Sequence, residues 1–122
     1  MYDNQLTIRD RLEDILESIN LIQEWSKNRT TVSDFMSSST GVMAFNACVM
    51  RFQVISEHVG KLLKDENKPL DEYKNIPWQA IYGMRNVISH EYANIDEDII
   101  VSVINDDLSP LKSAIEDLIQ KF

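Results

Sequence analysis

Five polar or ionisable side chains fall within eight residues late in the chain: Arg85, Asn86, Ser89, His90 and Tyr92. A histidine can accept or release a proton near neutral pH. An arginine can hold a phosphate through two parallel hydrogen bonds and stabilise the extra negative charge of a transition state. Arg85 and His90 together therefore suit the cleavage of an RNA phosphodiester without a metal ion, because the 2′-hydroxyl of the RNA supplies the nucleophile.

The spacing of these residues constrains how they could meet. At about 100° per residue, a helix places Arg85, Ser89 and Tyr92 on one stripe and Asn86 and His90 on another. Arg85 and His90 are then about 140° apart around the axis, which is too wide for one flat face. Either the helix breaks near His90, or a site is completed across the two-fold axis of a homodimer, where two copies of the helix approach each other.

Other catalytic or metal-binding constellations are missing from the sequence. The two histidines, His58 and His90, lie far apart, and no pair of Cys or His has the spacing of a zinc site. No glycine-rich phosphate-binding loop is present. We therefore expect no metal and no cofactor. Cys48 is expected to be a small buried apolar residue, and His58 a core or interface histidine.

Length and composition indicate one globular domain over residues 1–122. The chain is 43% hydrophobic and 26% charged, which excludes intrinsic disorder, and its three glycines and three prolines are too few for a many-stranded sandwich or barrel. The single cysteine, the lack of a secretory signal and the lack of a long apolar stretch favour the cytoplasm.

The charge is acidic overall but uneven along the chain. Twelve basic against 20 acidic residues give a net charge of −8, which disfavours broad, nonspecific binding of nucleic acids. Between Arg51 and Arg85, however, six basic residues face five acidic ones. If this protein handles RNA, we expect it to do so in a local cleft formed by this middle segment.

Apolar periodicity predicts an all-α fold, an up-and-down bundle of four main helices. The first runs from Thr7 to about Lys27, and a polar loop follows in which Phe35 and Met36 pack onto the core. The second runs from about Thr40 to Lys64. Its predicted inward residues are Met43, Ala47, Met50, Val54 and His58, extended by Ile55, Val59, Leu62 and Leu63.

The last part of the chain predicts the remaining helices. Pro77 suits the first position of a third helix. The inward residues of this helix are Trp78, Ile81, Met84 and Ile88. Asp96 is expected to cap a further helix, and Ser109-Pro110 to begin the last one, so that this final pair is one broken helix or two short ones.

The third helix carries a pattern that resembles a known family. Pro77-Trp78, Ile81, Gly83-Met84-Arg85-Asn86, His90 and Tyr92 are similar to the motif region of HepT-like toxins in the HEPN superfamily, in which Arg and a polar residue are followed by His and then Tyr. The stretch from Ile55 to Leu62 also resembles a helix of that family, although Ser56 and His58 replace the commoner Gly and Ala. The resemblance covers nearly the whole chain.

The resemblance implies a function and a partner. It implies a homodimeric, metal-independent ribonuclease in which Arg85 binds the scissile phosphate, His90 is the acid/base and Asn86 orients one of them. It also implies that a nucleotidyltransferase antitoxin of the MntA type transfers AMP units to Tyr92. A bulky anionic adduct beside Arg85 would repel RNA and switch the enzyme off.

Simpler interpretations compete for the same residues. Arg85 could form an ion pair with Glu91 or with the acidic turn 96–98, His90 could bind carbonyl groups at a helix end, and Tyr92 could be a packed aromatic. A non-catalytic helical dimer that binds a nucleotidyltransferase is the main alternative, and a nucleotide-binding bundle is a weaker one.

Overall fold

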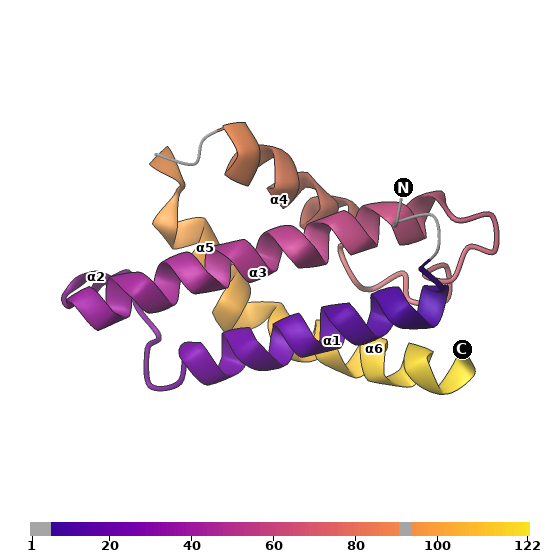
Figure 1. Ribbon diagram of the computed structural model, residues 1–122, viewed down its shortest axis with the longest axis horizontal. Coiled ribbons are helices and arrows are strands. Elements are labelled where there is room, and N and C mark those ends of the chain that lie inside the picture. The colour runs from indigo at the N-terminus through magenta and orange to yellow at the C-terminus, as the bar shows by residue number, and fades with distance from the viewer. Residues whose placement is uncertain (1–5, 91–93) are drawn as a thin grey trace.

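The computed structural model describes residues 6–90 and 94–122, which form six helices (Figure 1). In chain order these are α1 (Ile8–Trp25), α2 (Val32–Met36), α3 (Ser39–Lys64), α4 (Trp78–His90), α5 (Glu97–Asp106) and α6 (Leu108–Lys121). No strand occurs among the described residues, and the predicted all-α fold is confirmed.

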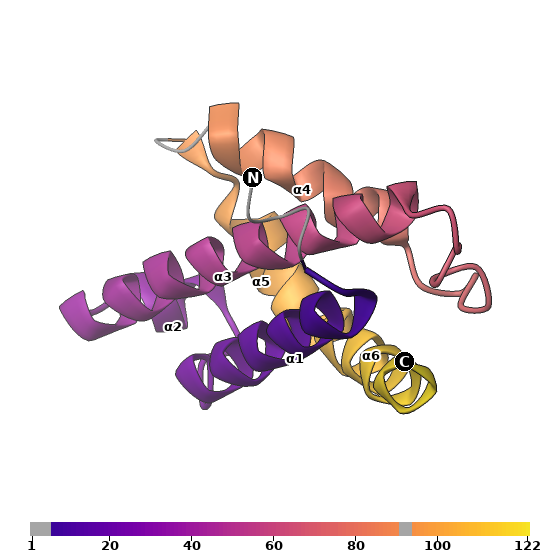
Figure 2. The ribbon, with the colours of Figure 1, turned by 45° about the vertical axis from the view of Figure 1, so that its right-hand side comes forward.

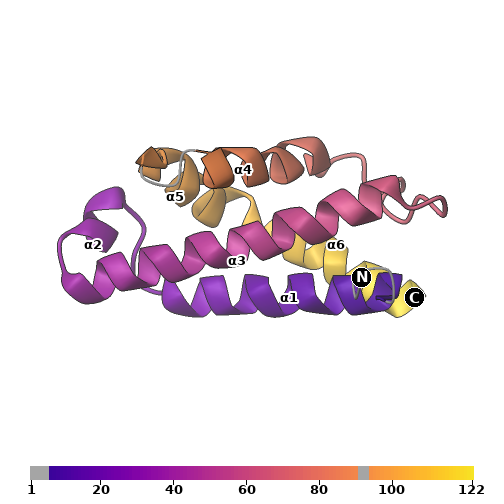
Figure 3. The same cartoon turned by 45° about the horizontal axis from the view of Figure 1, so that its top comes forward.

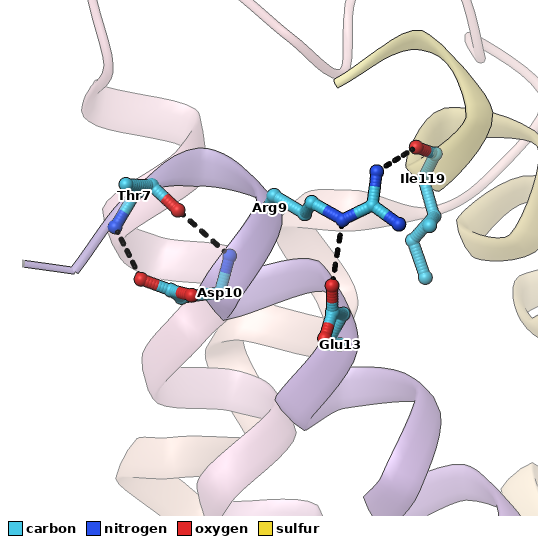
Figure 4. Close-up of polar contacts among 5 residues, drawn as sticks. All are labelled: Thr7, Arg9, Asp10, Glu13 and Ile119. Carbon is cyan, nitrogen blue, oxygen red and sulfur yellow. Dashed lines mark hydrogen bonds and ion pairs between the residues drawn. The ribbon is translucent and has the colours of Figure 1, made fainter.

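The first helix begins where its capping residues predict. The Thr7 hydroxyl accepts a hydrogen bond from the Asp10 N–H, and the Asp10 carboxylate accepts one from the Thr7 N–H, each at 3.0 Å (Figure 4). This reciprocal pair satisfies two donors that the first helical turn leaves unpaired. The hydrogen bonds from Thr7 also hold the pKa of Asp10 below its ordinary value. In the same first turn, Arg9 donates hydrogen bonds to Glu13 and to the Ile119 carbonyl (Figure 4). The second of these bonds ties α1 to α6.

The long helix α3 is the centre of the bundle. It runs antiparallel to α1 on one side and to α4 on the other, while α6 packs along α1 (Figures 1 and 3). The view in Figure 2 shows α4 and α6 on different sides of α3. Their shared core is made of large aliphatic and aromatic side chains, among them Leu12, Ile15, Ile19, Phe52, Ile55, Val59, Ile88, Ile115 and Leu118. Burial of each such side chain contributes about 1.5–3 kcal/mol.

The expected polar loop between the first two long helices contains a short helix instead. Thr31 and Asp34 form a second capping box, and this box starts α2. The helix carries Phe35 into the core, where its ring meets that of Phe45 edge to face at 5.7 Å between centroids. Met36 packs against the same cluster, so both side chains lie on the core as predicted.

The predicted inward face of α3 is wrong in its first half. Met43 and Met50 are each 66% exposed, and the core receives Phe45, Cys48, Val49 and Phe52 instead. Apolar residues occur almost all round this half of α3, so periodicity alone does not choose between the faces. In the second half, the predicted Ile55, Val59 and Leu62 are buried.

The remaining boundaries differ from prediction by one or two residues. Pro77 lies just before α4, and its carbonyl accepts the first helical hydrogen bond from the Ile81 N–H at 3.0 Å. Asp96 caps α5 as predicted. The break comes at Asp107, so α6 begins at Leu108 and Pro110 lies inside its first turn, where the missing N–H leaves no bond unmade.

Candidate active site

The helix α4 positions the predicted motif residues. Trp78, Ile81, Met84 and Ile88 face the core as predicted, and each is 9% exposed or less. This anchoring leaves Arg85 and Asn86 exposed on the outer side of the helix. His90 is the last residue of α4, its side chain lies outside the described residues, and so does the whole of Tyr92.

The backbone of α4 bears on the two alternatives left open by the spacing, because His90 is the last residue of this helix. The helix continues from Trp78 through His90, so no break lies between Arg85 and His90. The two positions therefore project from the axis about 140° apart. Within one chain, Arg85 and His90 do not share a flat face of the helix.

A buried hydroxyl fixes α4 against α3. Ser56 is fully buried, and its Oγ lies 2.8 Å from the Phe52 carbonyl and 2.9 Å from the Ile81 carbonyl. The second contact crosses from α3 to α4 one turn before Arg85. Ser56, one of the two departures from the family pattern, therefore has a structural role in holding the motif helix in place.

Arg85 lines a groove of about 270 Å³ between α1, α3 and α4. The residues that line it are Arg11, Glu57, His58, Gly60, Lys61, Lys64, Tyr82 and Arg85. Four of them are cationic and one is a carboxylate. This cationic groove contrasts with the net charge of −8 for the whole chain, and it is the local basic cleft that the charge distribution predicts.

One wall of the cationic groove is formed by a close helix crossing. A Cβ atom at Gly60 would lie 2.4 Å from Cε1 of Tyr82, so only glycine lets the ring approach α3 this closely. Lys64 Nζ lies 5.7 Å from the centroid of the same ring, within the range of a cation–π interaction. Tyr82 thus joins α4 to α3 and orients a lysine along the groove.

The other wall is held by a chain of three polar side chains. A nitrogen of the Arg11 guanidinium lies 3.3 Å from Nδ1 of His58, and Nε2 of His58 lies 3.2 Å from Asp14 Oδ2. Because a guanidinium can only donate, Nδ1 accepts and the proton of a neutral imidazole faces Asp14. His58 is thus a largely buried, hydrogen-bonded histidine, in keeping with the core or interface position that the sequence predicts.

Similarity to known proteins identifies the family of this chain. The profile of the family described as "Ribonuclease HepT-like" matches residues 15–118, from the middle of α1 into the last turns of α6. This chain belongs to the HepT-like ribonuclease family. The resemblance inferred from the motif of α4 is confirmed.

Two relatives show how far the similarity to HepT-like ribonucleases extends. A Thermococcus cleftensis protein named "Probable ribonuclease HepT" is 29% identical over 110 residues, which cover 90% of this chain and 94% of the relative. A Methanocaldococcus jannaschii protein named "Gamma-glutamylcyclotransferase and putative RNase MJ0434" is 31% identical over 107 residues. That match covers 85% of this chain but 44% of the longer relative. No solved structure is significantly similar to this chain.

Sequence reasoning missed three contributors to the cationic groove of this HepT-like ribonuclease. Lys61 and Lys64 were counted only as part of the basic middle segment, and Arg11 was not singled out. Arg11 did leave a trace in the sequence, because it lies four residues before Ile15 on the inward stripe of the first helix. A cation on a buried stripe is unusual and marks a site that needs it.

Cys48 does not line the cationic groove. Cys48 is buried in the core as predicted, and burial raises the pKa of its thiol to about 12 although Arg29 partly opposes the shift.

Within residues 6–90 and 94–122, no three His, Cys, Asp or Glu residues gather as metal ligands do. Of the helices described, none combines the length and the apolar character needed to cross a bilayer.

Proposed function

We propose that this protein is the toxin of a toxin–antitoxin pair and acts as a metal-independent endoribonuclease. The observation that carries the proposal is the position of Arg85, exposed in a groove where cations outnumber carboxylates four to one. A polyanionic substrate can bind there although the chain is acidic overall. Membership of the HepT-like ribonuclease family supports RNA as that substrate.

The proposed reaction uses the RNA as its own nucleophile. His90 takes the proton of the 2′-hydroxyl, the 2′-oxygen forms a bond to phosphorus, and the bond from phosphorus to the 5′-oxygen breaks. A proton from a histidine neutralises the leaving 5′-oxygen, so the products are a 2′,3′-cyclic phosphate and a 5′-hydroxyl. Arg85 binds the phosphate and stabilises its added negative charge, and Asn86 orients the phosphate or the imidazole.

The geometry of α4 favours a site shared between two copies. Because Arg85 and His90 diverge around one helix, we propose that Arg85 of one subunit works with His90 of the other across a two-fold axis. The exposed Met43 and Met50 on α3 support a homodimer, since methionine is enriched at protein interfaces. Beside Met43, a largely apolar depression of about 470 Å³ adds to this surface.

We also propose that the activity is controlled at Tyr92. A nucleotidyltransferase antitoxin of the MntA type would transfer AMP from ATP: the Tyr92 oxygen bonds to the α-phosphorus and pyrophosphate leaves. Each added AMP places a negative charge two residues from His90, where it would compete with RNA for Arg85.

The proposal is tested by cleavage and by mass. Purified protein should cut RNA in the presence of EDTA and leave cyclic phosphate ends, and both Arg85→Ala and His90→Ala should reduce the rate by at least about 100-fold. Co-expression with a neighbouring nucleotidyltransferase should add the mass of one or more AMP units, and Tyr92→Phe should abolish the addition. A wild-type protein that cuts no RNA would favour a non-catalytic helical partner instead. Cleavage that survives both Arg85→Ala and His90→Ala does not come from this site and would favour the same alternative.

A further inference from the structure

The cationic groove extends well beyond the motif of α4. Arg11 comes from α1, and Lys61 and Lys64 come from one face of α3, three residues apart. Among the described residues, no carboxylate lies within ion-pairing distance of Lys61, Lys64 or Arg85. Gathering four cations around one carboxylate, Glu57, raises the energy of the folded protein unless an anion binds between them.

Two of these cations are held in place before any ligand arrives. Arg11 is only 9% exposed, and its contact with His58, itself fixed by Asp14, orients the guanidinium at the wall of the groove. Lys64 lies over the ring of Tyr82. An ordered cation loses less conformational entropy on binding than a free surface lysine does, so these contacts favour a binding site over a merely solvated face.

The size of the groove limits what it can hold. The groove has a volume of about 270 Å³. This is enough for the phosphate and sugar of one nucleotide. The described lining offers cationic donors, and its one aromatic ring, that of Tyr82, is already packed against Gly60 and Lys64. These features suit recognition of a backbone phosphate and not of a base.

We propose that Arg11, Lys61 and Lys64 form a subsite that binds the RNA backbone next to the phosphate held by Arg85. This inference rests on the proposed ribonuclease function and assigns it a second phosphate-binding position. The subsite supplies affinity that is independent of base sequence, whereas Arg85 and His90 perform the cleavage. Glu57, the single carboxylate among the described residues that line the groove, opposes this binding.

Binding to an RNA that cannot be cut isolates the subsite. The probe is a short single-stranded RNA with 2′-O-methyl groups, which keeps the phosphates and blocks the reaction. We expect Lys61→Ala and Lys64→Ala each to weaken binding about 3- to 10-fold, and the double variant to lower the slope of log K against log salt by up to about 1.4, at ~0.7 per phosphate contact. Glu57→Gln should tighten binding a few-fold.

Three controls make the result specific. Lys27→Ala removes an exposed lysine just beyond the far end of α1 and should bind the probe like the wild type. Lys61→Arg and Lys64→Arg retain the charge and should retain most of the affinity. ATP and inorganic phosphate are added as competitors, and displacement of the RNA by either at micromolar concentration would overturn the proposal in favour of a free-nucleotide or phosphate site.

The outcome separates this inference from the proposed function. Normal cleavage of RNA together with unchanged probe binding by the two lysine variants would overturn the subsite and leave the ribonuclease intact. Loss of probe binding in those variants, in a protein that never cuts RNA, would support the subsite and contradict the ribonuclease. Failure of the wild type to bind the probe at all would overturn the subsite directly.

Discussion

Gly60 lets the ring of Tyr82 on α4 pack against the backbone of α3 at one wall of the cationic groove. A Cβ at position 60 would stand 2.4 Å from Cε1 and 2.7 Å from Cδ1 of the ring, well inside van der Waals contact. The ring in turn lies under Lys64. The glycine thus sets the spacing of the two helices at the point where the groove is built.

The contact between Gly60 and Tyr82 determines whether substitution of Gly60 raises or lowers the free energy of unfolding. Gly60→Ala gains about 1 kcal/mol of helix propensity, but the clash with Tyr82 costs about 1–3 kcal/mol, so we expect net destabilisation. In a Tyr82→Ala background the clash is gone, and the same substitution should stabilise by up to about 1 kcal/mol. Urea unfolding of the four proteins measures the cycle. If Gly60→Ala changed the free energy of unfolding equally in both backgrounds, the Tyr82 ring would not be in contact with position 60.

Ser56 makes a second test of how α4 is held. Ser56→Ala removes a buried hydrogen bond to the Ile81 carbonyl, and we expect a loss of about 1 kcal/mol in the free energy of unfolding. The matched control is Ser113→Ala, the same change at an exposed position of α6, which should stabilise by a few tenths of a kcal/mol. If both variants are stabilised in denaturant unfolding, the contact between α3 and α4 contributes nothing.

Cys48 should be almost unreactive in the folded protein. Burial raises the pKa of its thiol from 9.0 to about 12, so at pH 8 the reactive thiolate is roughly a thousandfold scarcer than in an unperturbed thiol. Labelling with a thiol reagent such as DTNB should therefore be slow in buffer and rapid in denaturant. Labelling at the same rate in both conditions would mean that the core around Cys48 is open to solvent.

The exposed methionines of α3 should govern dimer formation. Met43→Asp and Met50→Asp each place a charge on the proposed interface and should convert a dimer into a monomer in size-exclusion chromatography with light scattering. Ile99→Asp is the control, because Ile99 is an exposed apolar residue of α5 that lies outside this surface. A wild-type monomer, or a dimer that survives both methionine substitutions, would contradict the proposed interface.

The sequence predicts the features of the fold that depend on interactions between residues close together in the chain. The N-caps at Thr7 and Asp96 and the inward face of α4 depend on neighbours in the chain, and their prediction from the sequence is confirmed. The choice between Met43 and Phe45 on α3 depends on which helices pack there, so the apolar pattern could not make it. Arg11 joins the groove because α1 lies beside α3. Its position on the inward stripe of α1 marks it as unusual but does not show which groove it lines.

Some residues of the candidate site are also predicted by the sequence, and others are not. The motif Arg85, Asn86, His90 and Tyr92 was identified from residue types and spacing, and Arg85 lies in a cationic groove. The roles of all four residues stay predictions, and so do the antitoxin partner and the dimer. The role of Lys61 and Lys64 could not be predicted from the sequence, because a charged residue near the end of a helix is most often solvated.

The most direct test of a shared active site mixes two inactive subunits. Differently tagged Arg85→Ala and His90→Ala chains are co-expressed, and the heterodimer is isolated through both tags. If Arg85 of one subunit works with His90 of the other, the heterodimer contains one intact site of two and should cleave RNA at about half the wild-type rate, while each variant homodimer is inactive. A heterodimer as inactive as the two homodimers would contradict the account.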